Sequence, residues 1–562
     1  MGELRIFGPP GTGKTTRLST HEVPNAVKKY GSDKVVVASF TKAAATEIIN
    51  KRSRITGKTI PVIEENVGTL HSLCYRKLSN PDIAELKKAQ WNQYSPEYAM
   101  SAKAVSLGFD GADEGVHANG SFNGTKGDQL MNECNINRAK LLPQRLWSQE
   151  HLAFFTRWKK WKEKEGLIDF TDLIEDAIVT QSQAPNESEV IFIDEAQDFT
   201  PLQLKLVRQW AKNAQWLVLC GDDDQTIYKF TGAEPQGFLN PPVSEKFKRY
   251  LDQSYRMPEK IYEKSQHFIS LVKFRQPKVF KPKNVKGNII YMDRSVTWKN
   301  PVSIVNEAFH HSQAGKSVMI IGSCSYMIDP IKHEFIHSGI PFSNRYRMRR
   351  GDWNPLSRSR KGTLASKDLL LAFLQKGPDG DYWTIPQLIT WAPWIKVGDN
   401  GLQRIKAKKA LKELKEAVED GRRGLQTSRN VLRHIFNDPA LKPALSRNIQ
   451  WFLENIKSSR KEALDFPVAV HSKVGEKGLI EDPKITIGTI HSVKGGEADI
   501  VYLFPDISIM AHREASHTQS NMDALYRLFY VGMTRTKDTL VIPSPAIKGT
   551  SRKEMCMDEL FI

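Results

Sequence analysis

A glycine-rich segment close to the start of the sequence has the residues of a phosphate-binding loop. The apolar run Leu4–Phe7 leads into it, and it matches the pattern G-x-x-x-x-G-K-[ST]. Its residues, with the threonine that follows, are Gly8, Pro9, Pro10, Gly11, Thr12, Gly13, Lys14, Thr15 and Thr16. In such a loop, backbone N–H groups and the N-terminal end of the next helix face phosphate oxygens. Lys14 is then placed to reach the outer phosphates and Thr15 to ligate Mg²⁺, so the segment predicts a nucleoside triphosphatase.

Two adjacent carboxylates follow another apolar run, Val190–Ile193. Asp194, at the end of that expected strand, is placed to hold Mg²⁺ through its water shell. Glu195 is placed to orient and deprotonate an attacking water. Adjacent acids after a buried strand can also be a plain strand end, but a phosphate-binding loop in the same chain favours the catalytic interpretation.

A glutamine and two aromatic residues follow the next apolar run, Trp216–Cys220. Gln225 is placed to contact the terminal phosphate and to respond to its loss. Tyr228 and Phe230 come next, on either side of Lys229. Aromatic faces beside cationic side chains suit base stacking along a single strand, which contributes roughly 1–3 kcal/mol per base. Such rings more often belong to a core, but their position beside Gln225 favours the binding interpretation.

The charge of the chain indicates a polyanionic partner. With 562 residues, a net charge of +18 and a pI near 9.4, the sequence favours nucleic acid over a membrane surface. A basic protein with no such partner is the alternative. The five cysteines are scattered without C-x-x-C spacing, which argues against a disulfide framework and a zinc site. No apolar run approaches the ~18 residues of a membrane span, and no export signal precedes the first expected strand, so we expect an intracellular, cytoplasmic protein.

Apolar runs rich in β-branched residues recur along the sequence between stretches of helical pattern. They are Lys34–Ala38, Val190–Ile193, Trp216–Cys220, Val318–Ile321, Ile500–Leu503 and Thr539–Ile542. Such runs are typical of parallel strands covered on both faces. Because they fall into two groups, we expect two α/β cores, each interrupted by a mostly helical stretch. The second interruption holds a segment, 404–423, whose Ile405, Leu411, Leu414 and Val418 lie on one helical face; we interpret it as a solvated amphipathic helix.

Eight segments in order resemble the motifs of the UvrD/Rep/PcrA branch of superfamily 1 DNA helicases, in its A-type subgroup. They read GPPGTGKT (8–15), SFTKAAATEI (39–48), GTLHSLCYR (68–76), IDEAQD (193–198), GDDDQTIYKFTGA (221–233), QSYRMP (253–258), GTIHSVKGGEAD (488–499) and LFYVGMTRTKDTL (528–540). The resemblance spans nearly the whole chain. It implies an ATP-dependent DNA helicase that moves 3′-to-5′ on single-stranded DNA and unwinds duplexes, in replication, repair or recombination.

The resemblance also implies roles for individual residues. In the nucleotide site they are Lys14, Thr15 and Asp194 for phosphate and Mg²⁺, Glu195 as catalytic base, Gln225, Arg256 and Arg535 at the γ-phosphate, Tyr255 against the adenine, and Glu497 at the ribose. Single-stranded DNA would be contacted by Phe40, Thr41, His71, Tyr228, Phe230 and His491. The arginine roles fit the side chain, because a planar, permanently charged guanidinium suits phosphate.

The family's fold implies two RecA-like P-loop NTPase motor domains, each a parallel sheet flanked by helices with a mostly helical insertion. The boundaries that we predict are 1–79 with 160–258 for motor domain 1A and 80–159 for accessory domain 1B. For the second half they are 259–372 with 484–562 for motor domain 2A and 373–483 for a short accessory domain 2B. Expected ligands are ATP, Mg²⁺, single-stranded DNA and junctions of single- and double-stranded DNA. We expect a monomer in solution; protein loading partners stay open.

The sequence departs from the family pattern at several positions. Phe230 stands where many relatives have tryptophan, Thr231 where they often have arginine, and Gly496 in place of the leucine of K-G-L-E. The family's adenine-reading glutamine lies upstream of the loop and is not in the sequence, which predicts loose base selection. Two alternatives stay open: a translocase that strips proteins from single strands without robust unwinding, and an ATP-gated nucleic-acid binding protein. RNA as the main substrate is a weaker alternative.

Overall fold

The computed structural model describes residues 2–57, 62–101, 124–344, 356, 364–377, 380, 382–421, 427–546 and 556–557. Contacts divide the chain into two units. The first comprises Met1–Trp298, Ile321–Met327 and Thr489–Ile562, and the second Lys299–Ile320 and Ile328–Gly488. The boundaries of the four domains stay predictions. In the described part of the chain, no helix is long and apolar enough to cross a membrane.

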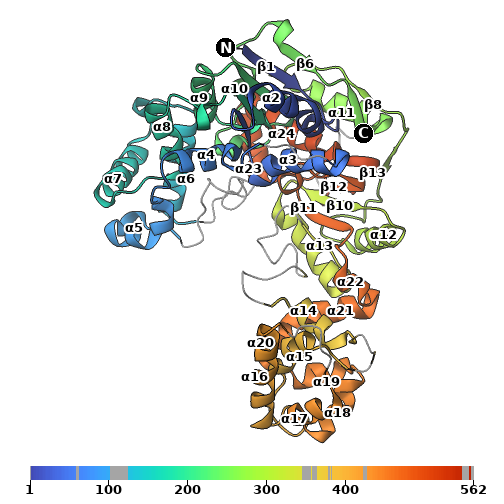
Figure 1. Cartoon of the computed structure of the whole chain (residues 1–562). Helices are drawn as coiled ribbons and strands as arrows, with labels where there is room; N and C mark the ends of the chain where they lie inside the picture. The colour runs from blue at the N-terminus through green and yellow to red at the C-terminus, as the bar shows by residue number, and fades with distance from the viewer. Residues whose placement is uncertain are drawn as a thin grey trace. The chain divides into compact units, whose positions relative to one another are not determined.

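The first unit contains a six-stranded parallel sheet, of which Figure 1 labels β1 and β6. Its order is β3-β2-β4-β5-β1-β6, with β1 Gly2–Phe7, β2 Val35–Ser39, β3 Val67–Gly68, β4 Val190–Asp194, β5 Trp216–Gly221 and β6 Lys248–Tyr250. Strand β1 aligns Phe7 with Gly221, and β2 aligns Ser39 with Asp194. Because all strands run the same way, the segments after β1, β4 and β5 leave the sheet at one edge, where ligands bind in open α/β sheets.

Alternate strand residues of this sheet enter two hydrophobic clusters. One contains Val36, Ile191 and Leu217 with buried residues of α4 (Leu70–Lys77), α8 (Phe170–Thr180) and α9 (Pro201–Ala211). The other contains Val37, Val190 and Val218 with Leu18, Val23 and Ile48 of the helices after β1 and β2. Those helices are α1 Lys14–Arg17, a π-helical turn Leu18–Glu22, α2 Val23–Tyr30 and α3 Lys42–Thr56. This two-residue alternation explains the continuous apolar runs, and the predicted α/β class is confirmed.

A helical segment between β3 and β4 has its own tryptophan-rich core. Its helices are α5 Lys88–Tyr94, α6 Lys126–Ala139 and α7 Gln149–Glu165. Trp91, Phe154, Trp158 and Trp161 are fully buried in it. Arg138 and Lys162 both pair with the buried Asp169 at the start of α8, at 2.9 and 2.6 Å. These buried pairs tie α6 and α7 to α8 because removing one partner would leave an uncompensated charge.

A second, five-stranded sheet has the order β11-β10-β12-β13-β9. Its strands are β9 Asn288–Tyr291, β10 Val318–Gly322, β11 Ile485–Thr489, β12 Ala498–Leu503 and β13 Thr536–Ile542. Strand β13 pairs in parallel with both β12 and β9. Helices α11 (Glu259–Ser270), α23 (Ile509–His517) and α24 (Gln519–Met533) belong to the same unit as these three strands, and β7 (Gln253–Pro258) pairs with β8 (Lys281–Lys283). In the chain, strand β13 follows directly on α24, and the turn between them contains Arg535.

The second unit is mostly helical where it is described. Its helices include α12 Val302–Gln313, α14 Ser366–Leu374, α15 Ile385–Trp391, α16 Lys406–Glu419, α17 Arg429–Ile435, α18 Asp438–Leu445, α19 Ile449–Asn455, α20 Ser458–Lys461, α21 Asp465–Val474 and α22 Lys477–Ile480. Stacked aromatic rings, such as Phe373 on Phe452 at 4.4 Å, fill its core. The amphipathic helix expected over 404–423 is α16, but Ile405 precedes it and is 81% exposed. The residues that α16 buries are Ala407 and Ala417, so the expected apolar face was partly wrong.

Candidate active site and nucleic-acid interface

The phosphate-binding loop leaves the carboxyl end of β1 and depends on two glycines. Gly11 and Gly13 have φ of 72° and 80°, in the left-handed region that favours glycine. A Cβ on Gly11 would also lie 2.5 Å from the Cβ of Arg256. Lys14 begins α1, and its Nζ donates to the Gly8 carbonyl oxygen at 2.8 Å. The loop therefore wraps around the buried lysine.

Thr15, the last residue of the loop, contacts Asp194 at the end of β4. The Thr15 hydroxyl donates to Asp194 Oδ2 at 3.4 Å, and Asp194 Oδ1 is buried with no hydrogen-bond partner among the described residues. Burial, with the neighbouring charge of Glu195, raises the pKa of Asp194 to about 7. A hydroxyl and a carboxylate are hard oxygen ligands that suit Mg²⁺ completed by waters and phosphates. The two residues therefore fit the metal role, although no group of three or more His, Cys, Asp or Glu that could hold a metal occurs in the described ranges.

Glu195 has an unusual backbone conformation. Its φ of 52° and ψ of 41° are left-handed, which is costly for a residue with a side chain and is often found at functional sites. Its Oε1 lies 4.0 Å from Lys14 Nζ, and Gln197 donates to its Oε2. Burial works to raise the pKa of Glu195, but the charges of Lys14 and Lys494 outweigh it, and the pKa lies below its ordinary value. The carboxylate is therefore ionised beside the loop.

Gln225 joins the loop after β5 to the segment after α24. Its side-chain amide donates to Asp222 Oδ2 at 2.7 Å, and its Oε1 accepts from Arg535 Nη2 at 3.0 Å. Arg535 is buried and also donates to the carbonyl oxygens of Val531 and Gly496. These contacts hold the guanidinium and the amide in fixed orientations beside each other.

Arg256 and Glu497, predicted to bind phosphate and ribose, pair with each other. Arg256 Nε donates to Glu497 Oε2 at 2.7 Å, and its Nη1 to the Thr534 carbonyl oxygen at 3.3 Å. Burial works to raise the pKa of Glu497, but the charge of Arg256 lowers it. Tyr255 donates its backbone N–H to the Gly11 carbonyl oxygen at 2.9 Å, and its side chain is 72% exposed. The structure thus places Tyr255 and Arg256 against the loop.

Four of the predicted DNA-contacting residues form one aromatic group. Phe40 stacks on Tyr228 with centroids 4.9 Å apart and planes at 20°. Phe230 meets Tyr228 edge-on at 5.9 Å and His491 at 5.5 Å. The Tyr228 hydroxyl donates to the His491 carbonyl oxygen at 3.3 Å. Phe40, Tyr228 and Phe230 are half-buried, so the group keeps partly accessible rings.

The other two predicted DNA-contacting residues lie at helix starts. Thr41 precedes α3, and its hydroxyl accepts the Ala44 N–H at 3.2 Å. His71 is the second residue of α4, and burial lowers its pKa to about 4, so its ring is neutral at physiological pH. In the described ranges, no ring contact links His71 to the aromatic group.

Comparisons with known proteins agree with this geometry. Residues 1–247 match the UvrD/REP helicase N-terminal domain, and residues 402–545 the UvrD-like helicase C-terminal domain; together the matches cover more than half of the chain. An ATP-dependent DNA helicase PcrA of Staphylococcus epidermidis is 23% identical over 99% of this chain and 83% of its own length. One of Staphylococcus aureus is 25% identical over 61% and 48%. The chain belongs to the UvrD/Rep/PcrA type of superfamily 1A helicases. The predicted pair of RecA-like motor domains is therefore confirmed.

Lys494 is a residue of this UvrD-type site that the sequence did not single out. Its Nζ donates to both carboxylate oxygens of Asp198 and, at 2.7 Å, to the Gln225 carbonyl oxygen. It also lies 4.9 Å from the centre of the Tyr228 ring. Lys494 belongs to the motif GTIHSVKGGEAD (488–499), but Asp198 lies 296 residues earlier, so no local pattern predicted their pairing.

A buried charge cluster supports the helicase's Asp222–Asp224 segment. Lys278 Nζ lies 3.1, 2.6 and 2.9 Å from the carboxylates of Asp222, Asp223 and Asp224. Arg275 adds two hydrogen bonds to Asp224, and Arg527 Nε donates to the Asp223 carbonyl oxygen at 2.9 Å. Nothing in the spacing of Lys278 and Arg275 predicted these contacts. The cluster fixes the segment that carries Gln225.

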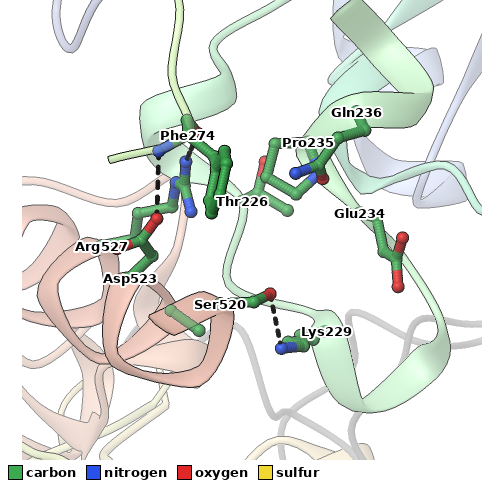
Figure 2. Close-up of a pocket in the computed structure, with 10 residues that line it drawn as sticks. Thr226, Lys229, Glu234, Pro235, Gln236, Phe274, Ser520, Asp523 and Arg527 are labelled. Carbon is green, nitrogen blue, oxygen red and sulfur yellow. Dashed lines mark hydrogen bonds between the residues drawn. The ribbon is translucent and has the colours of Figure 1, made fainter. Parts of the chain in front are cut away.

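A small hollow lies beside the same segment (Figure 2). It is lined by Thr226, Lys229, Glu234, Pro235, Gln236, Phe274, Ser520, Asp523, Ala524 and Arg527. Its cavity volume of about 10 Å³ is room for about one water. It is therefore too small to be the nucleotide site of this helicase.

Proposed function

We propose that the protein is an ATP-dependent DNA helicase that moves 3′-to-5′ along single-stranded DNA and unwinds duplexes, in replication, repair or recombination. The observation that carries the proposal is the continuity of one segment. Gln225 accepts from Arg535, and the same segment leads within a few residues to Tyr228 and Phe230 in the aromatic group. Phosphate chemistry and strand contact are thus joined in one short stretch. The names of the relatives support ATP and DNA as ligands, and the resemblance of the motifs supports the polarity.

The phosphates of ATP would lie against the loop Gly8–Thr15. Backbone N–H groups and the start of α1 favour negative charge there, and Lys14 would exchange its bond with the Gly8 carbonyl for phosphate. Thr15 and Asp194 would hold Mg²⁺, which supplies positive charge to the phosphates. That charge would also lower the pKa of Asp194, so the residue would be ionised with ATP bound.

Glu195 would act as the general base. Its carboxylate is ionised and held by Gln197, so it can orient a water and accept a proton from it. Lys14 and Lys494 keep its pKa low, which favours the ionised form before the reaction. The left-handed backbone of Glu195 is costly, as strained residues at functional sites often are.

Arg256, Glu497 and Arg535 would respond to ATP by changing partners. The pair between Arg256 and Glu497 can open so that the arginine turns to the γ-phosphate and the carboxylate to the ribose hydroxyls. Arg535 already lies beside Gln225, where its bonds to the Val531 and Gly496 carbonyl oxygens hold it. Rigid guanidinium donors on the γ-phosphate stabilise the charge that develops during transfer.

Glu195→Gln tests the proposal. The change removes the base and keeps the shape, so ATPase stimulated by single-stranded DNA should fall by at least about 100-fold. Glu163→Gln, at an exposed position of α7, is the matched control and should behave as wild type. Nearly intact turnover in Glu195→Gln would refute the base assignment.

Unwinding of duplexes with a 3′ or a 5′ single-stranded tail tests the rest. We expect ATP-dependent unwinding with the 3′ tail and little with the 5′ tail. DNA-stimulated ATPase without strand separation on either substrate would favour the stripping translocase. DNA binding that requires ATP, without turnover, would favour the binding protein.

A further inference from the structure

In the sequence, Lys229 lies between Tyr228 and Phe230, whose rings are predicted to stack on bases. Its own side chain contacts helix α24. Its Nζ donates to Ser520 Oγ at 2.8 Å, as Figure 2 shows. It also donates to Asn521 Oδ1 at 2.5 Å, and both acceptors lie at the start of α24. The side chain is half-buried. Two of the three ammonium donors are therefore used within the protein.

Helix α24 contacts the segment 223–229 along one face. Ser520, Asp523 and Arg527 are spaced i, i+3 and i+7, which places them on the same side of a helix, and all three line the hollow in Figure 2. Arg527 holds the Asp223 carbonyl oxygen, and Arg535, just after the helix, holds Gln225.

The contacts of Arg527 with Asp223, of Arg535 with Gln225 and of Ser520 with Lys229 fall at different points of the segment 223–229. Asp523 also accepts hydrogen bonds from the backbone N–H groups of Lys273 and Phe274, so the helix face is fixed to this loop as well. The Lys229 contacts form the end of this series that adjoins the aromatic group. The start of α24 thus contacts Lys229, and Arg535, just after the end of the helix, contacts Gln225.

We propose that Lys229 is a positioning residue that couples α24 to the rings of Tyr228 and Phe230 through Ser520 and Asn521. The inference deepens the proposed function and rests on it. When Arg535 engages the γ-phosphate, α24 moves with it, and the bonds of Lys229 carry that movement to the rings. Lys229 acts through α24 and makes no contact with DNA in this role.

The test compares both sides of the contact. Lys229→Met removes the ammonium and keeps an unbranched side chain; Ser520→Ala with Asn521→Ala removes its partners and keeps the charge. Lys160→Met, at an exposed position of α7, is the matched control. For each protein we would measure basal ATPase, DNA-stimulated ATPase, the DNA concentration at half-stimulation, its salt dependence, and unwinding of a 3′-tailed duplex.

We expect Lys229→Met and the Ser520/Asn521 double variant to lower the unwinding rate by about tenfold each. The triple variant should be no slower than either, because coupled residues are not additive. Basal ATPase, half-stimulation and salt dependence should stay at wild-type values. Lys229→Arg, which can still donate to both partners, should recover most of the unwinding.

Other outcomes would overturn the inference. If Lys229→Met alone weakens DNA binding and lowers the salt slope by about one, Lys229 is a phosphate contact. If both variants unwind normally, or if their losses multiply in the triple variant, the contact does not position the rings. A wild-type protein without DNA-stimulated ATPase would instead overturn the proposed function itself.

Discussion

Replacing Lys494 with methionine should destabilise the protein in a pH-dependent way. Lys494 Nζ donates to both oxygens of the buried Asp198, at 2.7 and 2.5 Å, and to the Gln225 carbonyl oxygen. Burial raises the pKa of Asp198 to about 7 even though Lys494 lowers it. Without the lysine, the pKa of Asp198 must rise further, because burial is then opposed by fewer positive charges.

The size of the effect follows from this pKa. Below pH 7, Asp198 is mostly protonated in wild type and variant alike, so the variant loses mainly the hydrogen bond to Gln225, about 1 kcal/mol. Above pH 7, wild type ionises and keeps its ion pair, whereas the variant must stay protonated. The difference grows by about 1.4 kcal/mol per pH unit, to a limit of about 3–5 kcal/mol for an unpaired buried charge. We therefore expect about 1 kcal/mol at pH 6 and about 3–4 kcal/mol at pH 9.

Thermal unfolding of both proteins at pH 6 and pH 9 measures this difference. At roughly 2–3 °C per kcal/mol for a unit of this size, the variant should melt about 2 °C below wild type at pH 6 and about 8 °C below at pH 9. Asp198→Asn with Lys494→Met removes both charges and should restore a pH-independent difference. An equal loss at the two pH values would refute the assignment of Asp198 as the titrating partner.

Three further perturbations test other parts of the structure. Phe230→Ala should retain ATPase at saturating DNA while unwinding drops, because a stacking surface of about 1–3 kcal/mol per base is removed and the phosphate site is not; equal loss of both, or of neither, argues against stacking. Gly11→Ala should abolish DNA-stimulated ATPase because the new Cβ would clash with Arg256. Gly421 also has a positive φ but lies in open space, so the control Gly421→Ala should cost only about 1–2 kcal/mol of stability in thermal melts. Glu85→Gln should leave stability at pH 5 nearly unchanged and raise it at pH 8. Burial raises the pKa of Glu85 to about 8, so the wild-type fold loses up to about 5 kcal/mol as pH rises from about 4.5 through 8. Melts that respond equally at both pH values would contradict this.

The strands that could be predicted from the sequence are those whose composition follows from burial on both faces. Residues 190–193 and 216–220 are covered by helices on each side, so every position is apolar, and the run is visible without the fold. Short or polar strands carry no such signal. Lys281–Lys283 forms β8 with two lysines, and Lys248–Tyr250 forms β6 at the edge of the sheet, where side chains need not be apolar.

The site residues likewise divide into those that a local sequence pattern predicts and those that depend on contacts between distant segments. The loop Gly8–Thr15 and the acids at 194–195 are local patterns whose chemistry is set by neighbouring residues, so their positions followed from the sequence; their roles stay predictions. Contacts between distant segments were invisible. No periodicity relates Lys494 to Asp198, or Lys278 to Asp223, because these pairs join segments that are far apart in the sequence. The pairing of Arg256 with Glu497 was missed for another reason: the resemblance assigns each residue a role toward the nucleotide and none toward the other residue.

In the proposed function, the register of the first sheet gives a short path from the phosphates to DNA. Parallel strands β1, β4 and β5 end at one edge, so the loop, the acids and the segment of Gln225 are neighbours without any long connection. That segment is fixed by buried charges at Asp222–Asp224 and by α24 along its length. A segment held this firmly cannot absorb a displacement at Gln225 by local bending, because each bond broken would leave a buried polar group unsatisfied. The displacement must therefore appear at its less buried end, where Tyr228 and Phe230 lie. In the proposed function, the coupling between hydrolysis and strand movement then follows from how polar groups are satisfied in this segment.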